Sequence, residues 1–132
     1  MFGPTNFTFV YNNCKFILFD DIVWEKNVED PDFDWLMKNI INDNNYTHVI
    51  PMAHIPPWDE QFAVGNELVY NLILANAAID ISIHGHIHGF TNSYRYNDFS
   101  EIQYITTDDL KDRNFILLTI NKSFYEIERV KF

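Results

Sequence analysis

The chain has 132 residues, which is enough for one domain and excludes two of ordinary size. Hydrophobic residues make up 47% of it and aromatic residues 17%, so we expect a buried core and exclude extensive disorder. The formal net charge of −10 disfavours nucleic acid and anionic membranes as partners, since both attract clustered Lys and Arg, and it favours cations.

No stretch approaches the roughly 20 apolar residues of a transmembrane helix, so no membrane segment is expected. The N-terminus lacks the basic and then apolar segments of a signal peptide, which predicts a cytoplasmic protein if the chain is complete. Cys14 is the only cysteine, so no internal disulfide can form. We expect Cys14 to be a small buried residue of a strand.

Two short strands open the chain, Phe7 to Tyr11 and Lys15 to Phe19. Asn12-Asn13 between them indicates a hairpin turn, because Asn tolerates positive φ. Asp20 and Asp21 follow the second strand, and we interpret them as solvated acidic residues. The alternative is that they contribute to a rim that attracts cations.

Helical and strand-like segments then alternate. A polar stretch from Trp24 to Asp34 is expected to be a loop, with Asp32 as the N-cap of a helix that runs to about Asp43. The next segments are a strand from Tyr46 to Ala53, a helix from Gln61 to about Ala78 and a strand from Ile79 to Ile83. This order predicts crossover units with neighbouring, partly parallel strands.

The pattern changes after Phe90 to four strand-like segments: Thr91 to Tyr96, Ile102 to Thr106, Phe115 to Asn121 and Phe124 to Phe132. Short polar turns join them, and Asn121-Lys122 is expected to be a hairpin turn. The sequence therefore predicts an α/β fold with a mixed sheet, two helices and antiparallel C-terminal hairpins. We expect a single domain over residues 1–132.

Three of the five histidines, His84, His86 and His88, fall close together after the strand that ends at Ile83. Two glycines are interleaved with them. A glycine-assisted turn would present the imidazoles at the carboxyl end of a sheet, where open α/β folds bind ligands. Because neutral imidazole is the commonest metal ligand in proteins, the cluster indicates a metal site.

A fourth histidine, His54, directly follows the third predicted strand and precedes Pro56-Pro57. The prolines end the strand ladder and stiffen the loop, because they lack a donor and have a fixed φ. His54 is therefore well placed to be held still. Trp58 and Asp59 lie just beyond and could line a substrate cleft, although packing within the loop is the simpler interpretation.

Ala53-His54-Ile55-Pro56-Pro57 resembles the His-x-Pro segment of the calcineurin-like metallophosphoesterases. Gly85-His86-Ile87-His88 resembles their Gly-His-x-His segment. The two occur in the family's order, each after a strand and with a helix between them, and the similarity extends over essentially the whole chain.

This resemblance implies half of a four-layer α-β-β-α sandwich that holds two divalent metals, drawn from Mn, Fe and Zn. His54 and His86 would ligate one metal and His88 the other. The implied reaction is hydrolysis of phosphate mono- or diesters by a metal-activated hydroxide, with a phosphoester small molecule or a phosphoprotein as substrate.

The family's Asp-x-His, Gly-Asp-x-x-Asp and Gly-Asn-His-Asp/Glu segments do not occur in this sequence. They carry the bridging carboxylate, the asparagine ligand and the histidine assigned to protonate the leaving group. Asp20-Asp21 and Asp108-Asp109 are the nearest acidic substitutes, and the sequence ties neither pair to the site. We therefore expect the C-terminal portion of such a domain, with metals partial or absent and little activity on its own.

A half-domain would expose an apolar sheet face, which an N-terminal half or a second copy of the chain would cover. Two other functions stay open. A degenerate, non-catalytic relative could keep the sheet as an interaction or scaffold module. A mononuclear zinc site made of histidines alone could place His86 and His88 at i, i+2 on one strand face.

The two remaining histidines are given structural roles. We interpret His84 as structural, or as a residue that supports a neighbouring ligand by fixing its tautomer. His48 lies in mid-strand and is interpreted as structural.

Overall fold

The computed structural model describes residues 4–21, 31–41, 45–62, 66–96, 101–123 and 125–132. Within these ranges the fold is mixed α/β, as predicted from the sequence. Most of the expected loop from Trp24, the predicted helix end at Asp43 and the predicted strand start at Phe124 lie outside the described residues.

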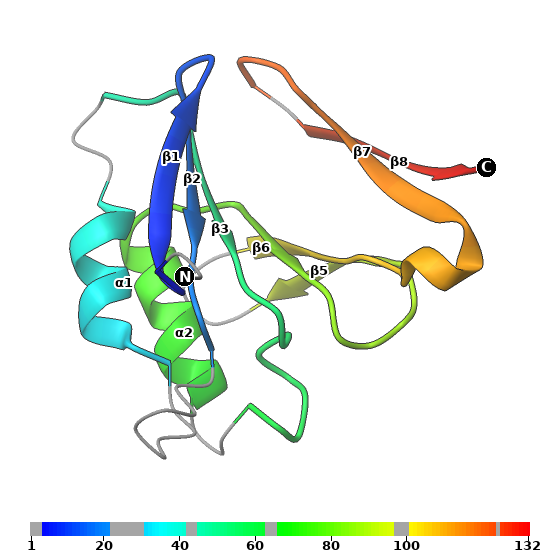
Figure 1. The fold of residues 1–132 in the computed structure, drawn as a ribbon. Coiled ribbons are helices and arrows are strands. Elements are labelled where there is room, and N and C mark those ends of the chain that lie inside the picture. Colours follow the sequence, from blue (N-terminus) through cyan, green and yellow to red (C-terminus); the bar gives the residue numbers. More distant parts are fainter. Residues whose placement is uncertain (1–3, 22–30, 42–44, 63–65, 97–100, 124) are drawn as a thin grey trace.

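A six-stranded mixed sheet forms the centre of the molecule (Figure 1). Its strands are β1 (Phe7–Tyr11), β2 (Cys14–Leu18), β3 (His48–Met52), β4 (Ile81–His84), β5 (Thr91–Tyr96) and β6 (Glu101–Thr106). The order across the sheet is β1-β2-β3-β4-β6-β5. Strands β2, β3, β4 and β6 are parallel, whereas β1 and β5 are antiparallel to their neighbours. The carboxyl ends of β2, β3 and β4 therefore meet at one edge.

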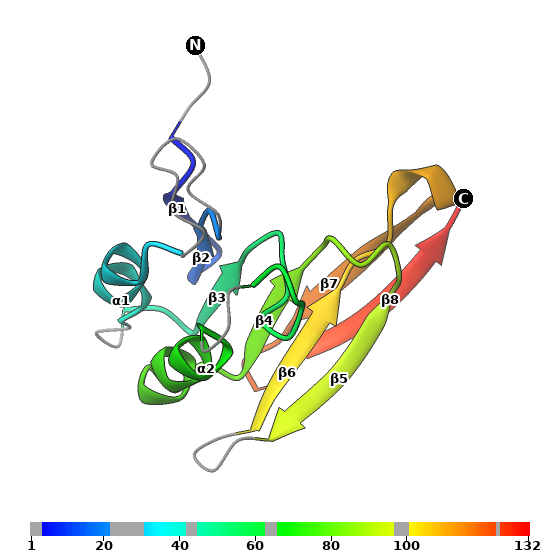
Figure 2. The ribbon, with the colours of Figure 1, turned by 90° about the horizontal axis from the view of Figure 1, so that it is seen from below.

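Two helices cover one face of this sheet, as Figure 2 shows. Helix α1 (Phe33–Ile40) connects β2 to β3, and α2 (Asn66–Asn76) connects β3 to β4. Asp32 caps α1 as predicted, because its carboxylate accepts a hydrogen bond from the backbone N–H of Trp35. The helices contribute buried side chains to the core, namely Leu36 from α1 and Tyr70 and Leu74 from α2. Neither described helix is long and apolar enough to cross a membrane.

An antiparallel hairpin lies on the opposite face, formed by β7 (Asn114–Ile120) and β8 (Tyr125–Lys131) (Figure 1). A short 3-10 helix, η2 (Leu110–Asp112), leads into it. The apolar residues that pack between the hairpin and the sheet are Leu118, Ile120, Tyr125 and Ile127 over Ile50, Ile81 and Ile105. Alternation along β3 explains the two faces, since Val49 packs with the helices and Ile50 packs with the hairpin.

Large apolar side chains are exposed on two elements. Every residue of β1 is exposed, including Phe7 and Phe9, although Phe9 stacks on Phe16 at 4.7 Å between ring centroids. The outer face of the hairpin exposes Phe115 and Leu117.

The joint between β3 and β4 is unusually short. Five residue pairs join β2 to β3, but only Met52 and Ile83 form a register pair between β3 and β4. Met52 turns its carbonyl to β2, where it accepts from the N–H of Phe19, whereas Ala53 donates to the carbonyl of Ile83 on β4. Because backbone groups alternate in direction along a strand, the nitrogen of Pro51 faces β4 and has no hydrogen to donate.

The second helix begins later than the sequence predicted. Residues 59–62 form a turn, in which the N–H of Phe62 donates to the carbonyl of Asp59 and the N–H of Gln61 donates to its carboxylate. This local hydrogen bonding by Asp59 competes with a helix at Gln61 and Phe62, and the described part of α2 runs from Asn66 to Asn76. The other element boundaries lie close to those predicted.

Candidate metal centre

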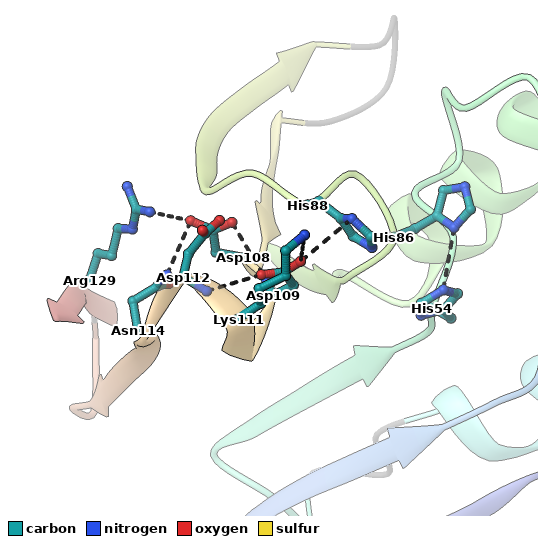
Figure 3. Close-up of polar contacts among 9 residues, drawn as sticks. All are labelled: His54, His86, His88, Asp108, Asp109, Lys111, Asp112, Asn114 and Arg129. Carbon is teal, nitrogen blue, oxygen red and sulfur yellow. Dashed lines mark hydrogen bonds and ion pairs between the residues drawn. The ribbon is translucent and has the colours of Figure 1, made fainter. Parts of the chain in front are cut away.

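Two of the predicted ligands meet at the carboxyl edge of the parallel strands. His54 follows β3 and His86 follows β4, and these strands are neighbours in the sheet. The Nε2 atom of His54 lies 3.3 Å from the Nδ1 atom of His86, and the rings are edge to face at 84° (Figure 3). The fold therefore brings together two imidazoles that are 32 residues apart in the sequence.

The turn that follows β4 holds two histidines in the left-handed region. The φ angle is 67° at His86 and 50° at His88, and the N–H of Ile87 donates to the carbonyl of Gly85 at 2.8 Å. A glycine-assisted turn was expected, but neither Gly85 nor Gly89 has a φ in the left-handed range of +20° to +160°. Left-handed backbone costs a non-glycine residue about 1–2 kcal/mol, and such strain concentrates at functional sites.

Gly85 has a different role, since it lies against the ring of His54. A Cβ at this position would be 3.4 Å from Nδ1 of His54, at the near limit of ordinary van der Waals contact. The N–H of Gly85 also donates to the carbonyl of His54 at 3.0 Å. The backbone at Gly85 is therefore hydrogen-bonded to His54 and lies within contact distance of its ring.

Each of the two turn histidines faces a carboxylate. Asp59 Oδ1 lies 3.7 Å from Nε2 of His86. Asp109 Oδ2 lies 3.7 Å from Nδ1 of His88 (Figure 3). A carboxylate beside one imidazole nitrogen favours a proton on that nitrogen and leaves the other nitrogen able to bind a metal. Asp59, which the sequence suggested as a supporting or cleft residue, thus lies at the histidine pair.

Asp21 corrects the sequence analysis, which treated it as solvated and unconnected to the site. It is 3% exposed, and its carboxylate accepts a hydrogen bond from the N–H of Ile55, the residue after His54. Burial raises the pKa of Asp21 to about 6, while the N–H of Ile55 and the nearby His86 act in the opposite direction. Asp21 follows closely after β2, which is parallel to β3. Its position just after a strand was the sequence signal that could have assigned it to this edge.

Asp109 also corrects the prediction from the sequence, which connected neither acidic pair to the histidines. Asp109 approaches His88, and Lys111 approaches the same carboxylate at 3.8 Å. The neighbouring Asp108 pairs with Arg129 and accepts from the amide of Asn114. These contacts arise from the loop before η2, which the sequence pattern did not place.

His84 lies behind the site in the core. It is 2% exposed, and its ring lies near the rings of Trp58, Tyr70 and Tyr104. Its Nδ1 lies 3.1 Å from the carbonyl of Ile55, which can only accept, so Nδ1 carries the proton.

The tautomer of His84 fixes the rest of a buried chain of hydrogen bonds. Its Nε2 accepts from the hydroxyl of Ser82 at 2.8 Å, and Ser82 accepts from Tyr70 at 2.7 Å. Burial lowers the pKa of His84 to about 3, so the ring is neutral. His84 and Asp21 therefore clamp the two sides of Ile55, next to His54.

The structure does not gather all the predicted ligands. Among the described residues, the one group of three potential ligand atoms within 4.8 Å of one another is Asp108, Asp109 and Asp112, and no histidine belongs to it. His88 faces Asp109, and its side chain is 70% exposed. Trp58 packs on Tyr104 with ring centroids 5.2 Å apart, on the core side of its loop.

The strand-face zinc site is not supported by the backbone. It required His86 and His88 on one regular strand, but β4 ends at His84 and both histidines lie in the turn. His48, the histidine assigned a structural role, begins β3 far along the chain from this turn and contacts the hairpin.

Comparisons with known proteins add no family. No protein-family model matches this sequence, and no characterised protein is significantly similar to it.

Proposed function

We propose that this chain supplies the histidine half of a divalent metal centre that hydrolyses phosphate mono- or diesters, as in the calcineurin-like metallophosphoesterases. The proposal includes the family's four-layer sandwich, in which the described sheet and hairpin would be one part. Two metals of the Mn, Fe and Zn group, when bound, would polarise a phosphoryl oxygen and activate water.

The spacing of His54 and His86 is the observation that carries this proposal. With metal–nitrogen bonds of about 2.0–2.1 Å and tetrahedral angles of about 109°, two ligating nitrogens lie about 3.3–3.4 Å apart. The distance from His54 Nε2 to His86 Nδ1 is 3.3 Å. The two nitrogens already have the separation of neighbouring ligands, so binding would need little rearrangement.

The chain's own residues have distinct roles in the proposal. His54 and His86 would bind the first metal, and His88, whose Nδ1 faces Asp109, would offer Nε2 to the second. Asp59 would hold the proton on Nε2 of His86. The bridging carboxylate and the leaving-group acid have no counterpart among these residues, so we propose that other segments or another chain supply them.

Metal binding by the purified chain is the first test. After dialysis against Zn²⁺ or Mn²⁺, elemental analysis should find bound metal, and calorimetry should show at least about tenfold weaker affinity in His54→Ala and His86→Ala. Asp59→Asn should weaken affinity by about 10–100-fold while the fold stays intact. Binding unchanged in His86→Ala would contradict the proposal.

His48→Gln is the matched control, since it removes a histidine outside the site and should leave metal affinity unchanged. Hydrolysis of an aryl phosphate monoester and an aryl phosphodiester, measured with the same samples, separates binding from turnover. We expect metal binding with little turnover by this chain alone. Rapid hydrolysis that survives loss of His54 and His86 would assign the activity elsewhere.

A mononuclear centre is the second candidate, because Asp59 lies at His86 and Asp21 at the residue after His54, whereas His88 pairs with Asp109 and is 70% exposed. It predicts one metal per chain that His88→Ala does not remove. The dinuclear centre predicts that His88→Ala lowers the metal content. A chain that binds neither Zn²⁺ nor Mn²⁺ would favour the non-catalytic scaffold.

A further inference from the structure

A second polar cluster lies where the hairpin meets the amino-terminal side of the sheet. The hydroxyl of Tyr125 on β8 is 2.7 Å from Nδ1 of His48 and 3.0 Å from Oδ1 of Asp80. The Nε2 of His48 is 2.7 Å from the carbonyl of Asn121 at the end of β7. Because His48 begins β3 and Asp80 immediately precedes β4, these contacts join the hairpin to two central strands.

These three hydrogen bonds need three hydrogens. A carbonyl only accepts, so Nε2 of His48 must carry a proton for Asn121. An ionised Asp80 also only accepts, so the Tyr125 hydroxyl must donate its single hydrogen there. No hydrogen then remains for the contact between Tyr125 and Nδ1 of His48, unless His48 carries a second proton.

The same count applies if the Tyr125 hydroxyl donates to His48 instead. Asp80 must then be protonated in order to donate to the Tyr125 oxygen. In either arrangement the complete set holds one proton more than a neutral His48 with an ionised Asp80. Since carboxylates are the stronger acids, that proton is assigned to His48.

We infer that His48, Tyr125 and Asp80 form a proton-dependent latch that holds the β7–β8 hairpin on the sheet. With the proton bound, Nδ1 of His48 donates to Tyr125, Tyr125 donates to Asp80, and the latch is complete. When His48 releases the proton to solvent, one of the three hydrogen bonds is lost. This inference goes beyond the proposed function and does not depend on it.

The surroundings suit this role. Burial and the neighbouring Asp80 raise the pKa of Tyr125, so its hydroxyl keeps its hydrogen at physiological pH. A cavity of about 200 Å³ is lined by His48, Asp80, Lys122 and Tyr125, which gives His48 a route for proton exchange with solvent. The latch is therefore joined by hydrogen bonds and open to titration.

The charged and titratable groups around His48 come from every neighbouring element. Asp80 places a negative charge on the cavity that His48 lines, and Lys122 on the hairpin tip places a positive one there. Cys14 on β2 is the register partner of His48. Glu101 and Tyr94 line an adjacent cavity with Asp80 and Tyr125, and Glu101 adds to the negative side.

The sign of the pH dependence follows from the proton count. The latched state binds a proton that the unlatched state holds less tightly. Docking of the hairpin should therefore be firmest at mildly acidic pH and should weaken as the pH rises past the point at which His48 is deprotonated.

NMR of the ring nitrogens of His48 in the full chain tests this inference. In the wild type, both nitrogens should carry protons at the pH at which the hairpin amides are best protected. In Asp80→Asn, the pH at which His48 releases its proton should fall by about one unit, a tenfold loss of proton affinity. Asp34→Asn, an exposed change on α1, is the matched control and should not move it. An unchanged titration in Asp80→Asn would overturn the inference.

Amide exchange of the hairpin supplies the second readout. Protection of the β7–β8 amides, corrected for the intrinsic pH dependence of exchange, should fall between about pH 6 and pH 8 in the wild type. This fall should vanish in Tyr125→Phe and persist in Tyr11→Phe, which alters an exposed tyrosine on β1. A fall of the same size in Tyr125→Phe would contradict the latch. If Tyr125→Phe does not fold, Asp80→Asn decides, because Asp80 is exposed.

Discussion

A single residue, Ile55, links the core to the candidate metal centre through both of its backbone polar groups. Ile55 follows His54, its N–H donates to buried Asp21, and its carbonyl accepts from buried His84. Both partners are held by packing, so the position of His54 is set by residues that need not touch a metal. In metal sites such supporting contacts determine how precisely a ligand is oriented.

His84 should give the fold a distinct acid dependence. Its pKa is about 3 in the folded chain and about 6.5 when unfolded, so between these values the folded state binds fewer protons. The stabilisation is complete above about pH 6.5 and is lost as the pH falls toward about 3, on the order of 5 kcal/mol in all. The free energy of unfolding, measured in urea at several pH values, should follow this course.

His84→Asn is the diagnostic variant, because its amide can still donate to Ile55 but does not titrate. It should be about 1–3 kcal/mol less stable at neutral pH, owing to the smaller side chain, and it should lose much less stability in acid. Asp21 acts in the opposite sense at acidic pH, but it is present in both proteins and largely cancels in the comparison. If the free energy of unfolding of His84→Asn fell as steeply in acid as that of the wild type, another group would be responsible.

At the scale of the elements, the sequence predicted more of the fold than of the site. Alternating and helical apolar patterns placed the strands and helices within a few residues, because those patterns are local. The sequence also placed His54 and His86 at strand ends, which neighbouring parallel strands then brought together. The left-handed backbone of His86 and His88 carried no comparable signal, since glycines stood beside them.

The sequence did not predict that Asp21 and Asp109 lie near the site, for a different reason. Asp21 and Asp109 reach the histidines through pairings between distant strands and loops, which a local pattern does not contain. The packing of the hairpin across Ile50, Ile81 and Ile105 likewise depends on tertiary contacts. Strand order, once known, would have assigned Asp21 to the correct edge.

The hairpin is also anchored at the end near the site, by Arg129 and Asp108. The Asp108 side chain is 4% exposed, so removing its cation would leave a buried carboxylate without a charged partner. Arg129→Met should lower the free energy of unfolding by about 2–4 kcal/mol. Lys111→Met, which removes a cation that is 84% exposed, should change it by less than about 0.5 kcal/mol. Equal effects of the two changes in chemical denaturation would contradict this assignment.

For the molecule as a whole, charge and exposed apolar surface act against each other. The net charge of −10 keeps chains apart at low salt, while β1 and the outer face of the hairpin offer apolar contacts. Salt screens the repulsion and leaves the apolar attraction, so association should increase with ionic strength.

Leu117→Lys should reduce this salt-induced association in sedimentation velocity. Leu117 is 48% exposed on β7 beside Phe115, so a lysine there interrupts the apolar face. Leu110→Lys adds the same charge at a residue that is 77% exposed on η2, outside that face, and should leave association nearly unchanged. If both variants behave alike, the net charge rather than the hairpin face controls association.

The short joint between β3 and β4 has a consequence for the metal centre. His54 and His86 extend from opposite sides of that joint, where one register pair and the imino nitrogen of Pro51 replace a full ladder. A small twist between the two strands would change the distance between the two imidazoles. Pro51 would then influence which ionic radius the pair accepts. Pro51→Val restores a donor toward β4 and would hold the imidazoles at one separation.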